Sequence, residues 1–76
     1  MSELAKLKWR CRRGMKEMDI LLTRYLEQAY EQASKVEQQA FQALLDMPDI
    51  DLYSYLIGQE KPTNRDTLAL LEKIRQ

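Results

Sequence analysis

The sequence predicts an all-α protein, a compact bundle of about five short helices formed by a single domain over residues 1–76. Three observations support this fold class. Apolar residues recur at the three- and four-residue spacing of a helix face, no segment alternates as a strand does, and capping residues precede several of the apolar runs. A chain of 76 residues can bury only one small core.

The first two predicted helices lie on either side of Gly14. Residues 3–12 place Leu4, Leu7 and Cys11 on one side of a helix and Trp9 on another. Roughly residues 15–30 carry the strongest helical pattern in the chain. Its apolar positions are Met18, Leu21, Leu22, Tyr25, Leu26 and Ala29.

The remaining helices are predicted from their starts and stops. Ser34 and Glu37 form a capping-box pattern, and the helix that they open should end near Asp46 because Pro48 cannot continue it. A short helix follows, capped by Asp49 or Asp51, with Gly58 at its left-handed end. After a loop over residues 59–62, Thr63 and Asp66 are the expected caps of the last helix, whose apolar residues are Leu68, Leu70, Leu71 and Ile74.

The composition argues against an enzyme. The chain has no histidine and one cysteine, so it offers no Ser-His-Asp or Cys-His arrangement and no cysteine-rich zinc site. It also lacks a glycine-rich phosphate loop. Asp46, Asp49 and Asp51 surround Pro48, but without the glycine and glutamate of a calcium loop we interpret them as helix caps. Binding of a partner is therefore the expected kind of function.

Positive charge is concentrated at the beginning of the chain. Six basic residues and one acidic residue lie within residues 1–16, a net charge of +5, whereas the whole chain is neutral. This segment should either meet a negative partner or pack against the acidic remainder. With Trp9 in its middle it also permits a second hypothesis, an antitoxin-like or nucleic-acid-binding regulator that uses the basic N-terminal helix. The overall neutrality argues against nucleic acid.

Two further expectations concern redox chemistry and location. Cys11, beside Arg10 and Arg12, is either a reactive thiol of a redox sensor or a half-buried packing residue, and we favour packing because no second cysteine or base accompanies it. No apolar run approaches the roughly 20 residues of a membrane span, and the N-terminus lacks a signal-peptide core. A cytoplasmic protein without a membrane partner is expected.

Gly14 is the most informative residue in the chain. Glycine is unfavourable inside a helix by about 1 kcal/mol relative to alanine, so its position calls for an explanation. It either ends one helix and begins the next with a positive φ, or leaves bare backbone that a partner can approach closely. Both explanations can hold together, with Arg13 and Glu17 as opposite charges beside it.

These residues give the chain a resemblance to a known family. Arg13-Gly14-Met15-Lys16-Glu17 is similar to the Arg-Gly-x-x-Glu motif of the small succinate dehydrogenase assembly factors, bacterial SdhE and its mitochondrial relatives. Trp9, Arg10 and Arg12 precede the motif, and Asp19 with an apolar helix follows it, as in that family. The later segments resemble it also, although Tyr55 stands where relatives often have Trp and Met18 where they usually have Leu.

The resemblance implies an assembly chaperone rather than an enzyme. Such a protein binds the flavoprotein subunit of succinate dehydrogenase, and often that of fumarate reductase, and promotes covalent attachment of FAD to a histidine there. The FAD is implied on the partner, and no stably bound cofactor or metal is expected on this chain, which should be a monomer. The resemblance implies Arg13, Gly14 and Glu17 as the motif face, and we expect the full partner-binding site to include also Trp9, Arg10, Arg12, Met15 and Asp19. Gly14 would allow close approach, Arg13 would bond a partner carboxylate or carbonyl, and Glu17 would accept from the partner or orient Arg13.

Overall fold

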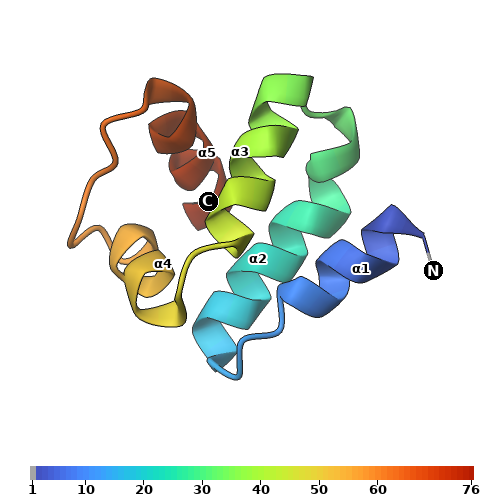
Figure 1. Ribbon diagram of the computed structural model, residues 1–76, viewed down its shortest axis with the longest axis horizontal. Coiled ribbons are helices and arrows are strands. Elements are labelled where there is room, and N and C mark those ends of the chain that lie inside the picture. The colour runs from blue at the N-terminus through green and yellow to red at the C-terminus, as the bar shows by residue number, and fades with distance from the viewer. Residues whose placement is uncertain (1) are drawn as a thin grey trace.

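A computed structural model describes residues 2–76 and contains, over these residues, five α-helices and one short 3₁₀ helix. The predicted all-α class is confirmed (Figure 1). The elements are α1 (Glu3–Arg10), α2 (Lys16–Gln28), η1 (Tyr30–Gln32), α3 (Lys35–Leu45), α4 (Asp49–Leu56) and α5 (Arg65–Arg75).

The helices pack as two connected groups around α2 and α5. Helix α1 lies against α2, and α5 packs against α2, α3 and α4 (Figure 1). The connection between α1 and α2 is a short turn at one end of the molecule (Figure 1), and Arg13 in this turn hydrogen-bonds to carbonyls of Leu45 and Met47, at and after the end of α3. This arrangement brings the turn and the connection from α3 to α4 close together, as the contacts described below show.

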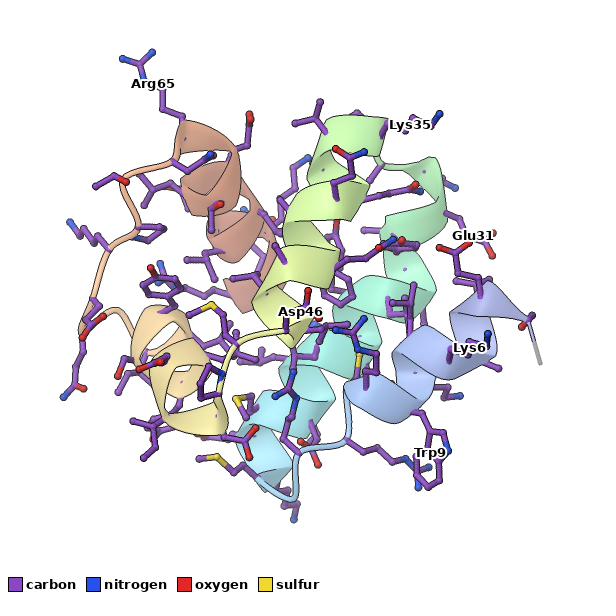
Figure 2. The ribbon with its side chains drawn as sticks, viewed as in Figure 1. Lys6, Trp9, Glu31, Lys35, Asp46 and Arg65 are labelled. Atoms are coloured by element: carbon purple, nitrogen blue, oxygen red, sulfur yellow. The ribbon has the colours of Figure 1, made fainter. Side chains whose placement is uncertain are left out.

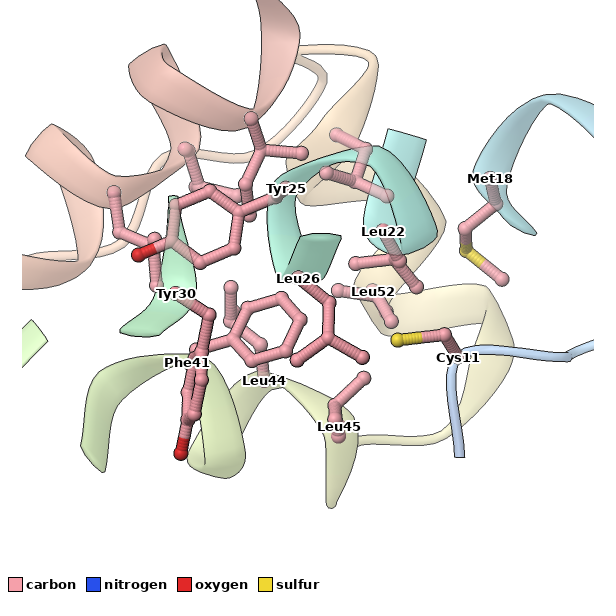
Figure 3. Packing of buried hydrophobic residues seen from close by; sticks show 14 of the residues in the cluster. Cys11, Met18, Leu22, Tyr25, Leu26, Tyr30, Phe41, Leu44, Leu45 and Leu52 are labelled. Carbon is pink, nitrogen blue, oxygen red and sulfur yellow. The ribbon is translucent and has the colours of Figure 1, made fainter. Parts of the chain in front are cut away.

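The core consists of the inward faces of all five helices and of η1. Phe41 lies at its centre, with the rings of Tyr25 and Tyr30 at centroid distances of 4.9 Å and 5.5 Å (Figure 3). Tilted aromatic pairs of this kind contribute about 0.5–1.5 kcal/mol beyond their buried area. The other members of this buried hydrophobic cluster are Leu7, Cys11, Met18, Leu22, Leu26, Leu44, Leu45, Leu52, Leu56, Leu70, Leu71 and Ile74.

The helical pattern predicted most of this core, with departures at its edges. Met18 is buried as expected, whereas the apolar side chain of Val36, on the first turn of α3, is 53% exposed. The second predicted helix also ends early. Ala29, at φ −131°, interrupts it, and the chain continues through η1, in which Tyr30 is buried against Phe41.

Two of the predicted helix caps are wrong. Helix α4 begins directly after Pro48, so Asp49 lies within its first turn and neither Asp49 nor Asp51 caps it. Helix α5 is capped by Asn64, whose side-chain oxygen accepts from the amides of Asp66 (2.8 Å) and Thr67 (3.2 Å). Helix α4 therefore begins one residue earlier than an Asp49 cap would place it and three earlier than an Asp51 cap would, and α5 begins one residue later than a Thr63 cap would place it.

The capping-box pattern at α3 is confirmed only in part. Ser34 Oγ accepts from the amide of Glu37 at 3.1 Å, as a cap should. The Glu37 carboxylate does not return to Ser34. It accepts hydrogen bonds from the Tyr25 hydroxyl and from Lys73 Nζ (2.6 Å), and so joins α3 to α2 and α5. These two donors lower the pKa of the Glu37 carboxyl group.

Both glycines have positive φ, 82° in each case. Gly58 follows α4, as predicted, and Gly14 lies in the connection between α1 and α2. The expectation that Gly14 separates two helices through its backbone conformation is confirmed. Over residues 2–76, the structure has no helix with the length and apolar character needed to cross a membrane.

Candidate partner-binding site

The turn between α1 and α2 presents the backbone of Gly14 without cover. A Cβ atom built on Gly14 would meet no heavy atom within 4 Å, so the positive φ, rather than crowding inside the chain, accounts for the glycine. Gly14, Lys16 and Glu17 are all exposed. The turn therefore offers an open strip of backbone followed by the exposed first turn of α2.

Asp19 holds this turn from within. Its Oδ1 accepts from the amide of Arg13 at 2.7 Å, and its Oδ2 accepts from the amide of Gly14 at 3.1 Å. One carboxylate thereby pairs with two successive backbone N–H groups that no helix satisfies. Asp19 is only half-buried, but both of its oxygens are engaged by the chain itself.

The side chain of Arg13 points inward, contrary to the expectation that it faces a partner. Its Nη1 donates to the carbonyl of Met47 at 3.0 Å and to Asp49 Oδ1 at 2.9 Å, and its Nη2 donates to the carbonyl of Leu45. Its Nε donates to the carbonyl of Arg10 at 3.0 Å, and the side chain is only 13% exposed. Asp49 and these carbonyls, rather than Glu17, orient the guanidinium group.

The physical reason lies in the end of α3. The last carbonyls of a helix lack intrahelical donors and carry partial negative charge, which a guanidinium group with its five donors satisfies well. The sequence analysis identified both the aspartates around Pro48 and the basic N-terminal segment, but it did not predict which of these residues pair. Asp46 accepts from Arg10 in the same way that Asp49 accepts from Arg13 (Figure 2 labels Asp46 at this connection).

Trp9 and Arg12 form the exposed side of the site. Trp9 is 62% exposed and points away from the helices (Figure 2), and the Arg12 guanidinium lies 5.5 Å from the centroid of its ring. A hollow of about 310 Å³ is lined by Ala5, Lys8, Trp9 and Arg12. Arg12 also lines a second, shallow hollow of about 610 Å³ that extends over α2 past Asp19 and Ile20. Met15, by contrast, is half-buried and packs against the core.

The positive segment packs against acidic residues of the rest of the chain. Besides the pairs of Arg10 with Asp46 and of Arg13 with Asp49, Lys8 Nζ lies 3.4 Å from Glu27 on α2. Of the two alternatives that the charge distribution left open, packing against acidic residues is observed for these three basic residues. Because three of the six basic residues of this segment are paired internally, the basic helix loses much of the charge on which the nucleic-acid hypothesis depended.

Cys11 is a packing residue. It is fully buried and its sulfur points into the core cluster (Figure 3). Burial raises the pKa of the Cys11 thiol to about 11, which outweighs the lowering effect of the nearby Arg13. A thiol that is buried and protonated is a poor nucleophile, so this environment does not favour the redox-sensor hypothesis.

Two of the three acidic residues around Pro48, Asp46 and Asp49, pair with arginine side chains. Within the described residues, no group of three or more Cys, Asp or Glu side chains is arranged to hold a metal ion. Sequence reasoning missed the carbonyls of Leu45 and Met47, which are the main acceptors of Arg13. Backbone acceptors leave no residue-type signal in a sequence, and only the packing of the two connections reveals them.

Fold and site together define a small all-α protein with an exposed turn between α1 and α2 that is hydrogen-bonded to Asp19. Comparison with known proteins identifies the family. Residues 5–76 match the family described as "Flavinator of succinate dehydrogenase", and the chain belongs to that family.

Several bacterial relatives carry the name "FAD assembly factor SdhE". The protein from Methylococcus capsulatus is 44% identical over 75 residues, which cover 99% of this chain and 90% of the relative. The protein from Coxiella burnetii is 42% identical over 71 residues, covering 93% and 87%. That from Xylella fastidiosa is 43% identical over 74 residues, covering 97% and 76%. The family resemblance indicated by the motif is confirmed.

Proposed function

We propose that this chain is an assembly factor that binds the flavoprotein subunit of succinate dehydrogenase and promotes the covalent attachment of FAD to it. Family membership and the names of the relatives support this function. The single structural observation that carries it is the open Gly14 turn, where the uncovered backbone of Gly14 and the exposed Glu17 are accessible to a partner protein. Fumarate reductase, whose flavoprotein subunit poses the same chemical task, is a second proposed client.

The mechanism that we propose is orientation. The chain contributes no catalytic residue, since it has no histidine and its one cysteine is buried and protonated. By docking on the flavoprotein it would hold the acceptor histidine and the flavin in a reactive arrangement, an effect that can lower a barrier by several kcal/mol, up to about 7–11. The FAD stays on the partner, and this chain holds none stably by itself.

The proposed contact surface comprises two kinds of residue. Gly14, Glu17, Trp9 and Arg12 are exposed and would touch the flavoprotein. Exposed aromatic and arginine side chains are the residues most enriched at the energetic centres of interfaces. The remaining residues of the expected site, Arg10, Arg13, Met15 and Asp19, are paired or packed within the chain and would support this surface. We further propose that the factor acts as a cytoplasmic monomer, without nucleic-acid or membrane partners.

The test uses two glycines that share one backbone conformation. Gly14→Arg and Gly58→Arg introduce the same side chain at φ 82°, with strain of about 1 kcal/mol at each site. Both variants should fold, because an added Cβ atom meets nothing within 4 Å at Gly14 and only the end of Arg75, at 4.0 Å, at Gly58. Each variant is co-expressed with the flavoprotein subunit, and covalent flavin is measured by in-gel fluorescence.

The expected result is that Gly14→Arg loses flavinylation and co-purification with the flavoprotein, whereas Gly58→Arg behaves like wild type. A Gly14→Arg protein with native helix content and normal flavinylation would show that the turn is not the contact. If the wild-type chain neither binds the flavoprotein nor raises its covalent flavin, the proposed function itself is wrong.

A further inference from the structure

We infer that Arg13 and Asp19 are positioning residues, which promote docking by holding the Gly14 turn in one conformation without touching the flavoprotein. This inference rests on the proposed function. Arg13 belongs to the motif that relates the chain to its family, yet its guanidinium group is directed into the molecule. Arg13 would therefore affect binding indirectly, through the position of the Gly14 turn.

Asp19 acts on the conformation of the turn. Glycine reaches positive and negative φ about equally well, so the Gly14 turn by itself is free to move among several conformations. The two bonds from Asp19 to successive amides select the conformation in which Gly14 has φ 82°. A surface that is ordered before binding loses less conformational entropy on docking, which strengthens the complex without any added contact.

Arg13 acts on the position of the turn. Its four donated bonds reach the end of α1 through Arg10, the end of α3 through Leu45, the α3–α4 connection through Met47, and the start of α4 through Asp49. The planar guanidinium group holds these acceptors in a fixed geometry that a lysine ammonium group does not reproduce. The Gly14 turn is thus fixed to the α3–α4 connection, and the two segments present one surface to a partner.

A double-mutant cycle within this chain separates positioning from direct contact. Arg13→Gln, Asp49→Ala and the double variant are compared with wild type for affinity toward the flavoprotein subunit, after circular dichroism has confirmed that each variant is folded. Residues that act as one unit are not additive. We expect Arg13→Gln to weaken binding about tenfold and Asp49→Ala about threefold, with the double variant within about twofold of Arg13→Gln alone.

The positioning role of Arg13 would be wrong if the fold-loss of affinity in the double variant equalled the product of the two single losses. It would also be wrong if Asp49→Ala left the affinity unchanged. Arg13→Lys serves as the second variant if Arg13→Gln does not fold. It keeps the charge but cannot reach all four acceptors, so it too should weaken binding, whereas a simple ionic contact with the partner would tolerate it.

Amide hydrogen exchange of the free protein tests Asp19. Asp19→Asn replaces one acceptor oxygen by a donor, so the amides of Arg13 and Gly14 should exchange about tenfold faster or more, and the affinity should fall about fivefold. Glu17→Gln is the matched control, because it alters an exposed carboxylate two residues away. It should weaken binding and leave the exchange of these amides unchanged.

The outcomes distinguish this inference from the proposed function. Weaker binding by Asp19→Asn without faster exchange would indicate a direct contact, and faster exchange without weaker binding would show that order in the turn is irrelevant; either result overturns the inference alone. Failure of wild type to bind the flavoprotein would overturn the inference together with the proposed function.

Discussion

At the scale of single residues, this chain shows how the same residue type serves different purposes according to its surroundings. Arg12 is exposed and lies over Trp9, whereas its neighbour Arg13 is nearly buried and bonded to backbone carbonyls. Both were expected at a partner-binding surface, and residue type alone does not separate them. The difference arises because only Arg13 reaches the end of α3, where unpaired carbonyls and Asp49 are available.

Cys11 provides a prediction at this scale. Because the thiol is fully buried and its pKa is raised to about 11, iodoacetamide at mildly alkaline pH should modify the native protein at least about 100-fold more slowly than the protein unfolded in urea. The rate of carboxamidomethylation, followed by mass spectrometry, measures this ratio. Similar modification rates in the native and unfolded protein would instead support the interpretation of Cys11 as a reactive thiol.

The same shift of the Cys11 pKa affects stability at high pH. The unfolded thiol ionises near its ordinary value of 9.0, whereas the folded thiol stays protonated until about 11. The contribution of the protonated Cys11 thiol to the free energy of unfolding is therefore complete below about pH 9. It is lost as the pH rises through the pKa of the thiol in the folded protein, about 11. Each unit of difference corresponds to about 1.4 kcal/mol, so Cys11→Ala should reduce the alkaline loss of stability in urea titrations.

At the scale of elements, the helices were predicted more reliably than their first residues. All five α-helices lie where apolar spacing and helix-breaking residues placed them, and Pro48, Gly14 and Gly58 separate them as expected. The observed N-caps are Pro48 for α4, where Asp49 or Asp51 was expected, and Asn64 for α5, where Thr63 was expected. A cap depends on which of several adjacent polar residues has extended backbone, and Thr63 and Asn64 compete for that position with nearly equal residue preference.

The cap of α5 provides a prediction at the scale of elements. Asn64→Ala removes the acceptor for two amides and should lower the free energy of unfolding by about 1 kcal/mol. Thr63→Ala, one residue earlier and exposed, is the matched control and should change it by less than about 0.5 kcal/mol. Urea denaturation of the two variants compares them directly. A larger loss of stability from Thr63→Ala than from Asn64→Ala would indicate that Thr63, as expected from the sequence, is the cap.

At the scale of the whole molecule, a few polar contacts join segments that the apolar core alone would leave loosely aligned. Arg13 ties the α1–α2 turn to the α3–α4 connection, Arg75 Nε donates to the carbonyl of Leu56 at 3.0 Å, and Glu37 joins α3 to α2 and α5. A protein of this size buries only about 60% of the surface that its unfolded chain exposes. Each such contact is therefore a sizeable part of the net free energy of unfolding.

Glu37 provides a prediction at the scale of the whole molecule. Its carboxylate is stabilised by Lys73 and Tyr25, which lower the pKa of the group. Its contribution to stability is therefore complete above the ordinary glutamate pKa of about 4.3 and is lost as the pH falls through the lower folded value. Glu37→Gln should lower the free energy of unfolding by about 1–2 kcal/mol at neutral pH, and this difference should shrink in acid.

Thermal denaturation of wild type and Glu37→Gln across the acidic range measures the effect. Glu31→Gln is the control, because Glu31 is exposed on η1, and it should change stability little at any pH. A Glu37→Gln difference that is independent of pH would mean that packing, rather than the charge of the carboxylate, provides the stabilisation.

The sequence by itself determined the helical class, the order of the helices, the turn at Gly14 and the membership of the family. These follow from local periodicity and from the backbone preference of single residues, which neighbours in the chain largely decide. The tertiary structure decided which motif residues face outward. Arg13 bonds to residues that lie 32 to 36 positions further along the chain, and Glu37 does the same with Lys73. Such contacts exist only after the helices have packed, because packing determines which carbonyls and carboxylates come within reach of each donor.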